Sequence, residues 1–258
     1  MASLAARLFP LLAGVLLAFT ASAGEPRRPK LVMLISGQSY AIERTLPEFA
    51  ARFLAPQFEV AIADGAMGNP EHRFDNFARV TSADLLLVSV WRRAPPRKQL
   101  ETIRRHVASG KPIVGIATAS HAWTLRKGAT PAPGSATWPE WDAEVIGGNY
   151  TGHRPAGLIT LITAATPSHA LLRGVALPFR SRMELNQVSP LQPAAHPVLV
   201  GSVEGFPAEP VAWTFLRRDG GRTFFTPLGH PEDFEQPAFQ RLLLNGIRWA
   251  AGLPLDVP

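Results

Sequence analysis

Three histidines stand where side chains for acid–base chemistry would be expected. His121 follows the apolar run Pro112–Ala117. His230 follows the strand candidate Arg222–Thr226, and His153 lies in a loop flanked by glycines. Imidazole gains and loses a proton near neutral pH, so these residues are candidates for catalytic proton transfer. For each of them, a hydrogen-bonded surface role is the alternative.

A second group of polar side chains is expected to bind a ligand at the same place. In open α/β sheets, ligands sit beyond the carboxyl ends of the strands. Guanidinium groups there would hold an anionic or hydroxyl-rich group. The residues predicted to bind are Glu43, Arg92, Arg93, Tyr150 and Asp233.

The sequence predicts no cofactor, and a divalent metal stays open as an alternative. His121, His153 and His230 could supply neutral imidazole ligands, with a carboxylate from Glu184 or Asp233. No HExxH or other closely spaced ligand pair supports such a site.

The segment Pro112–His121 resembles a nucleophile elbow, in which a sharp turn between strand and helix exposes a reactive side chain. In class I glutamine amidotransferases this side chain is a cysteine, and Leu228–Glu232 resembles the His-Pro-Glu element of their triad. The elbow position here is Ala117, and the chain has no cysteine, so cysteine-dependent chemistry is excluded. Ser120 would be the nucleophile of a serine hydrolase, but it lies past the elbow.

Three tryptophans surround the Gly- and Pro-rich segment 124–139: Trp123, Trp138 and Trp141. Aromatic rings stack well on the C–H faces of sugars, and they also pack well in cores and against loops. The sequence leaves both roles open.

Short, continuous apolar runs predict strands that are buried on both faces, as in a parallel sheet. The first four cover residues 31–36, 58–63, 84–90 and 112–117, and helical patterns separate them. We therefore expect an α/β fold, flavodoxin-like or glutamine amidotransferase-like, with a mainly parallel sheet and helices on both faces. The Asp-Gly-Gly turn before Arg222 predicts a C-terminal hairpin, and an amphipathic helix is expected over Pro237–Ala251.

The N-terminus has the features of a signal peptide. Arg7 precedes an apolar run, and Ala21-Ser22-Ala23 matches a signal-peptidase site. Residues 1–23 are thus expected to be removed, leaving one domain over 24–258 that is periplasmic or secreted and has no further membrane segment. The formal net charge is +6, but the basic residues are scattered, which argues against nucleic-acid binding. The oligomeric state is not predicted.

Several segments together resemble the ThuA-like (trehalose utilisation) family, especially its exported bacterial branch. They lie in the same order and with the same spacing over nearly the whole mature chain. The segments are Tyr40–Pro47, Arg92–Ala94 with Gln99, Gly115–Ala122, Gly147–His153, Pro210–Thr214, Leu228–Phe234 and Leu242–Ile247.

This resemblance implies a glutamine amidotransferase-like α/β fold and a small carbohydrate ligand, with keto-sugars among the candidates. It also implies a polar residue, often Arg or His, where this chain has Ala117. Two functions therefore remain open: an enzyme acting on a carbohydrate derivative, and a non-catalytic binding or interaction module with a degenerate site.

Overall fold

The computed structural model describes residues 27–37, 39–65 and 72–255. The predicted signal peptide, residues 1–23, lies outside this range. Within it, no helix is both long enough and apolar enough to cross a membrane.

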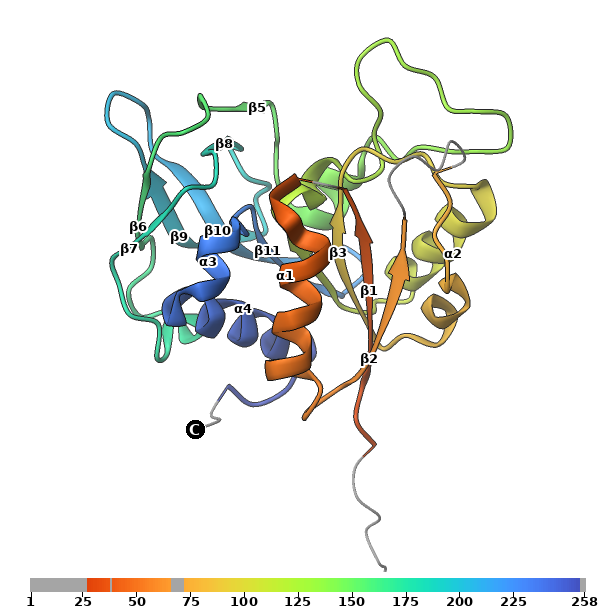
Figure 1. Ribbon diagram of the computed structural model, residues 1–258, viewed down its shortest axis with the longest axis horizontal. Helices are drawn as coiled ribbons and strands as arrows, with labels where there is room; N and C mark the ends of the chain where they lie inside the picture. The colour runs from red at the N-terminus through yellow and green to blue at the C-terminus, as the bar shows by residue number, and fades with distance from the viewer. Residues whose placement is uncertain (1–26, 38, 66–71, 256–258) are drawn as a thin grey trace, which may run out of the picture.

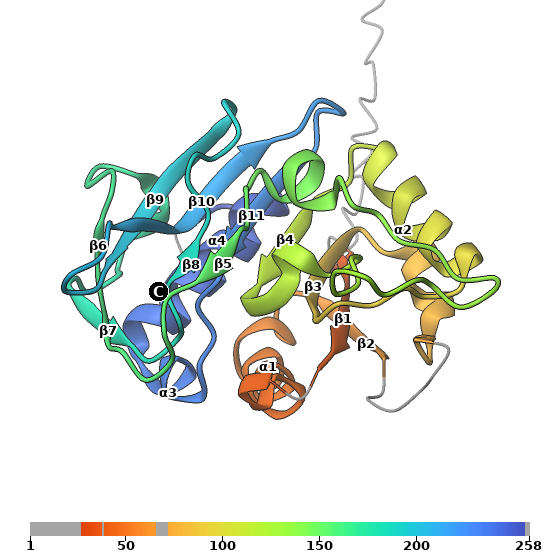
Figure 2. The ribbon, with the colours of Figure 1, turned by 90° about the horizontal axis from the view of Figure 1, so that it is seen from above.

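The described strands form one large sheet, in the order β2-β1-β3-β4-β11-β10-β9-β6-β7 (Figures 1 and 2). One half is parallel and confirms the predicted fold class. It consists of β1 (Lys30–Ser36), β2 (Glu59–Asp64), β3 (Leu85–Val90), β4 (Ile113–Ile116) and β11 (Arg222–Thr226).

The other half of the sheet is antiparallel. It consists of β6 (Thr160–Ala164), β7 (Phe179–Ser181), β9 (Ala195–Ser202) and β10 (Glu209–Leu216). The predicted hairpin joins the two halves through β10 and β11. A separate two-stranded ladder pairs β5 (Gly152–His153) with β8 (Asn186–Gln187).

Alternation along β1 divides the core into two layers. Leu31, Met33 and Ile35 pack on the face covered by α1 (Ile42–Phe49) and α4 (Pro237–Ala250). Val32 and Leu34 pack on the opposite face, which α2 (Arg97–Ala108) covers. Helices on both faces explain why the central strands β1 and β3 are buried and largely apolar.

Short helical segments complete the chain. They are η1 (Ser39–Ala41), η2 (Ala50–Leu54), η3 (Phe77–Ser82), η4 (Ala117–His121), η5 (Asp142–Ile146), η6 (Ala170–Leu172) and α3 (Pro231–Glu235).

The terminal helix α4 is confirmed in extent and orientation. It begins at Pro237, which loses no hydrogen bond at the first helical position. The predicted core-facing residues are all buried: Phe239, Leu242, Leu243, Ile247 and Ala250.

The three tryptophans belong to the core, which is one of the two roles that the sequence left open. Trp123 and Trp141 are fully buried, and Trp138 is 5 % exposed. Trp141 packs edge-on against both of the others, at 5.9 and 5.2 Å between ring centroids. Its Nε1 donates to the carbonyl of Ala119 at 2.7 Å and so fixes η4 against the core.

Candidate functional site

A cavity of about 240 Å³ lies where the parallel strands end. Tyr40 follows β1, Trp91 and Arg92 follow β3, and residues of η4 follow β4. The separate ladder β5–β8 also contributes, and it lies near these strand ends in Figure 1. The lining residues are Tyr40, Trp91, Arg92, Ala117, Thr118, His121, Arg126, Tyr150, His153, Met183, Glu184 and Asn186.

Three of these residues have backbones in the left-handed region, which side chains other than glycine rarely adopt. The φ angles are 63° at Tyr40, 48° at Arg92 and 53° at Ala117. Each such residue costs about 1–3 kcal/mol, and such strain clusters at functional sites. Its occurrence after three strands, around one cavity, favours this cavity as the functional site.

Ala117 has the geometry of an elbow but carries only a methyl group. Ile116 is extended, Ala117 turns left-handed, and η4 begins at once. The turn is tightly packed, since a Cβ on Gly115 would lie 2.6 Å from Cδ2 of Phe225. The position that carries the nucleophile in an elbow enzyme therefore offers none here.

His121 is the most strongly perturbed side chain of the cavity. It is only 8 % exposed, and its ring lies 4.6 Å from the ring of Tyr150. Burial, together with the charges of Arg92, His153 and Arg126, lowers the pKa of His121 to about 3. Nδ1 lies 3.2 Å from Oγ of Ser120, which leaves Nε2 for a ligand. His121 is thus a neutral imidazole at physiological pH.

Tyr150 is held in place by Asp142, a residue that the sequence reasoning missed. Oδ2 of Asp142 accepts the backbone N–H of Tyr150 at 2.6 Å. Burial raises the pKa of Asp142 to about 6, and burial also raises the pKa of Tyr150. A Cβ on Gly148 would lie 2.7 Å from Oδ1 of Asp142, so the loop can approach this carboxyl only with glycine there. The one signal that the sequence offered is a carboxylate five residues before Gly147-Gly148.

Arg92 and Arg126 bring positive charge to the cavity. Nη1 of Arg92 makes two long contacts, at 3.4 Å, to Oγ1 of Thr124 and the carbonyl of Leu125. The guanidinium of Arg126 lies 5.2 Å from the centre of the Trp91 ring. In the described part of the chain, neither arginine forms an ion pair with a carboxylate.

Three predicted binding residues do not line this cavity. Arg93 is 5 % exposed, and its Nε donates to Oγ of Ser36 at 2.6 Å while Nη2 donates to the carbonyl of Gly65. It ties the ends of β1, β2 and β3 together, and burial lowers its pKa. Glu43 is exposed on α1. The side chains of Arg92 and Arg93 thus point in different directions, and only Arg92 lines the cavity.

Asp233 is fully buried and serves the start of α3. Its Oδ2 accepts from Oγ of Ser181 at 2.9 Å and from the backbone N–H groups of Gly229 and His230, each at 3.0 Å. With His230 it forms a capping box, in which the side chain of each residue accepts a backbone N–H group at the start of the helix. This role is structural, and Asp233 does not reach the cavity.

His230 lies beside the cavity rather than in its lining. Its ring is 6.3 Å from the ring of Tyr40, and its Nδ1 accepts the N–H of Glu232 at 3.3 Å. The carboxylate of Glu232 pairs with Arg182 at 2.9 Å. The His–Glu pair of an amidotransferase triad is therefore not formed. Of the three predicted histidines, only His121 and His153 share the cavity.

Among the described residues, no group of three or more His, Asp or Glu side chains is arranged to hold a metal ion.

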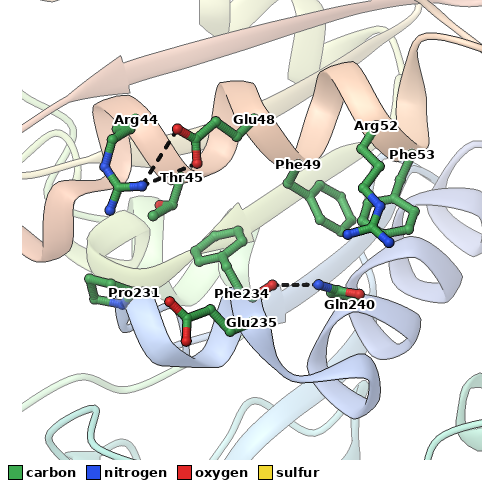
Figure 3. A pocket seen from close by; sticks show the side chains of 10 residues that line it. All are labelled: Arg44, Thr45, Glu48, Phe49, Arg52, Phe53, Pro231, Phe234, Glu235 and Gln240. Atoms are coloured by element: carbon green, nitrogen blue, oxygen red, sulfur yellow. Dashed lines mark hydrogen bonds and ion pairs between the residues drawn. The ribbon is translucent and has the colours of Figure 1, made fainter.

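Two other cavities lack this chemistry. One of about 170 Å³ lies between α1 and α3 (Figure 3), where Arg44 pairs with Glu48 at 3.2 Å and Gln240 donates to the carbonyl of Phe234. A larger one, of about 690 Å³, lies between α2 and β10 and has Arg104 stacked on Trp138 at its edge. Neither contains a histidine.

The same chain architecture occurs in solved structures. A ThuA-like protein from Bacteroides uniformis ATCC 8492 superposes with a TM-score of 0.65 at 14% identity, covering 90% of this chain and 95% of its own. One from Parabacteroides merdae ATCC 43184 gives 0.61 at 16% identity, with 90% and 93% covered. The cold-adapted β-galactosidase from Rahnella sp. R3 gives 0.58 at 12% identity, and there 88% of this chain matches 32% of the enzyme.

No protein of curated function matches the chain. The model of the trehalose utilisation family, ThuA, matches residues 32–250. That range contains the parallel half of the sheet except the first two residues of β1, all the residues that line the cavity, and the whole of α4. The chain therefore belongs to the ThuA, or trehalose utilisation, family.

Proposed function

We propose that this protein binds a carbohydrate derivative in the cavity and acts on its carbonyl group by acid–base chemistry. Family membership connects the chain with sugar utilisation. The observation that carries the proposal is the set of groups gathered around His121: a neutral buried imidazole, a second imidazole at His153, the phenol of Tyr150 and the guanidinium of Arg92.

The roles follow from the chemistry of each group. A keto-sugar carries a carbonyl whose oxygen becomes negative when a neighbouring proton is removed. Arg92 can stabilise that charge, and a neutral imidazole such as His121 can donate a hydrogen bond to the oxygen without becoming charged. His153, exposed at the rim, can accept the proton removed from that neighbouring carbon and exchange it with solvent. No covalent intermediate at Ala117 is involved.

A second candidate function is a non-catalytic carbohydrate-binding module. The methyl group at the elbow favours it, because the fold presents there a side chain with no reactivity. Tyr40, Trp91 and Tyr150 supply aromatic surface in the lining, which suits a sugar ring under either function.

We further propose that the protein acts outside the cytoplasm, after removal of residues 1–23. Mass spectrometry of the protein secreted by a bacterial host should then find Gly24, or a close neighbour, as the first residue. An intact N-terminus on the released protein would refute export by cleavage.

The first experiment is a thermal-shift screen of sugars, keto-sugars and divalent metals, since a ligand that binds only the native state raises the melting temperature. A sugar that binds is then incubated with the protein and followed by NMR for conversion. His121→Gln should abolish conversion, and binding as well if the ring contacts the ligand. His196→Gln, a change at an exposed histidine outside the cavity, is the matched control. Binding without conversion would select the binding module.

A further inference from the structure

The cavity carries more positive charge than its own carboxylate can balance. Arg92 and Arg126 line it, and Glu184 is the one acidic residue among the lining side chains. The two guanidinium groups and this carboxylate leave a net positive charge of one, before either histidine is counted. This positive charge lowers the pKa of His121, to which Arg92, His153 and Arg126 all contribute.

The two guanidinium groups remain available to a ligand. Among the described residues, Arg92 donates to two uncharged oxygens, each at 3.4 Å. Arg126 is exposed and rests on the face of Trp91. Arg93 shows the opposite case, since it is buried and hydrogen-bonded to Ser36 and Gly65. Guanidinium groups without a carboxylate partner bind planar oxyanions through paired hydrogen bonds.

We propose that the ligand of this cavity is a sugar acid, a monosaccharide whose carboxylate is bound by Arg92 and Arg126. This inference rests on the proposed carbohydrate function and adds the charge of the substrate. One carboxylate matches the net charge of the lining, whereas a phosphate monoester brings a charge of about −1.5 to −2. The volume of about 240 Å³ lies just below the usual range of roughly 300–1,000 Å³ for ligand pockets, which suits one sugar unit.

The test compares acidic and neutral sugars of the same skeleton. Binding of D-glucuronate and D-glucose, and of D-galacturonate and D-galactose, is measured by calorimetry on the full mature chain. Glucose 6-phosphate and glycolate are included to separate phosphate and simple carboxylate binding. The variants are Arg92→Gln and Arg126→Gln. Arg97→Gln is the matched control, since Arg97 is exposed on α2 and does not line the cavity.

The sugar acid should bind at least about tenfold more tightly than its neutral partner, since a hydrogen bond to a charged group contributes roughly 1.5–3 kcal/mol. Arg92→Gln and Arg126→Gln should remove this preference, and Arg97→Gln should retain it. Arg126 lies on an exposed loop, so its variant tests the proposal even if Arg92→Gln fails to fold. The bound carboxylate should also raise the pKa of His121, visible in its ring NMR signals.

The other outcomes separate the two proposals. Equal affinities for the acidic and the neutral sugars would refute the proposal that the ligand is a sugar acid, but would leave the proposed carbohydrate function intact. If glucose 6-phosphate binds more tightly than both sugar acids, the proposal that the bound group is a carboxylate is also refuted. Binding of glycolate with no sugar bound would refute the carbohydrate function while showing an anion site. If no probe binds, both proposals fail.

Discussion

At the scale of single residues, burial decides the chemistry more than residue type does. His121 and His106 are 8 % and 5 % exposed, and burial lowers the pKa of His106 to about 4 and that of His121 to about 3. The sequence could identify His121 as a site residue from its place after a strand. It could not distinguish Arg92 from Arg93, because adjacent arginines look alike until the backbone turns one toward the cavity and the other inward.

The lowered histidine pKa values predict a loss of stability in acid. In the unfolded state a histidine has a pKa near 6.5, whereas the buried ring of His106 has a pKa of about 4. Between these two pH values the unfolded state binds a proton that the folded state does not bind, so acidification favours unfolding. Asp142 opposes this, since its raised pKa lets the folded state hold a proton from about pH 6 downward. His106→Phe should therefore reduce the pH dependence of the unfolding free energy by up to about 1.4 kcal/mol per pH unit in this window. Urea titrations at several pH values give the comparison, and an unchanged slope would mean that His106 is charged in the native state.

Asp142 should control the position of Tyr150. Asp142→Ala removes the acceptor of the Tyr150 N–H, so this amide should exchange with solvent faster and the protein should lose about 1–3 kcal/mol. Asp142→Asn retains an oxygen acceptor and serves as the control, with slow exchange expected. Hydrogen exchange followed by mass spectrometry measures both. Equal exchange in the wild type and Asp142→Ala would show that the loop is held by other contacts.

At the scale of elements, the strands of the parallel half were predictable because burial on both faces makes them continuous apolar runs. The elbow was also predictable in place, since the run ends abruptly at Ala117. The short strand β7 and the ladder β5–β8 were not, because strands of two or three residues carry no periodic pattern. These pieces bring His153, Glu184 and Asn186 to the cavity. His153 was predicted from its glycine-flanked loop, whereas Asn186 was not predicted.

Helix α4 supports one stability prediction. Leu243 is fully buried against the sheet, so Leu243→Ala should cost about 2–5 kcal/mol through lost contacts and a residual cavity. Leu216, 57 % exposed at the end of β10, is the matched control, and Leu216→Ala should change stability by less than about 0.5 kcal/mol. Chemical denaturation measures both variants. A cost at Leu243 no greater than that at Leu216 would contradict the packing described.

At the scale of the whole molecule, the two halves of the sheet have different tasks. The parallel half supplies Tyr40, Arg92 and His121 at its strand ends, on strained but well-packed turns. The segments around the antiparallel half supply the residues that close the cavity, including His153 and Glu184. The sequence predicted Arg92 and His121 from their places after strand ends, but it did not predict Tyr40. How the antiparallel half closes the cavity depends on long-range pairing, which no local pattern encodes.

The central claim is that a carbohydrate derivative binds in the cavity that His121 and His153 share. The most direct measurement is the NMR spectrum of isotope-labelled histidine rings during titration with a sugar that raises the melting temperature. The signals of His121 and His153 should shift and saturate together, while those of His106 and His196 stay in place. A stabilising sugar that leaves His121 and His153 unmoved would bind elsewhere and would contradict the claim.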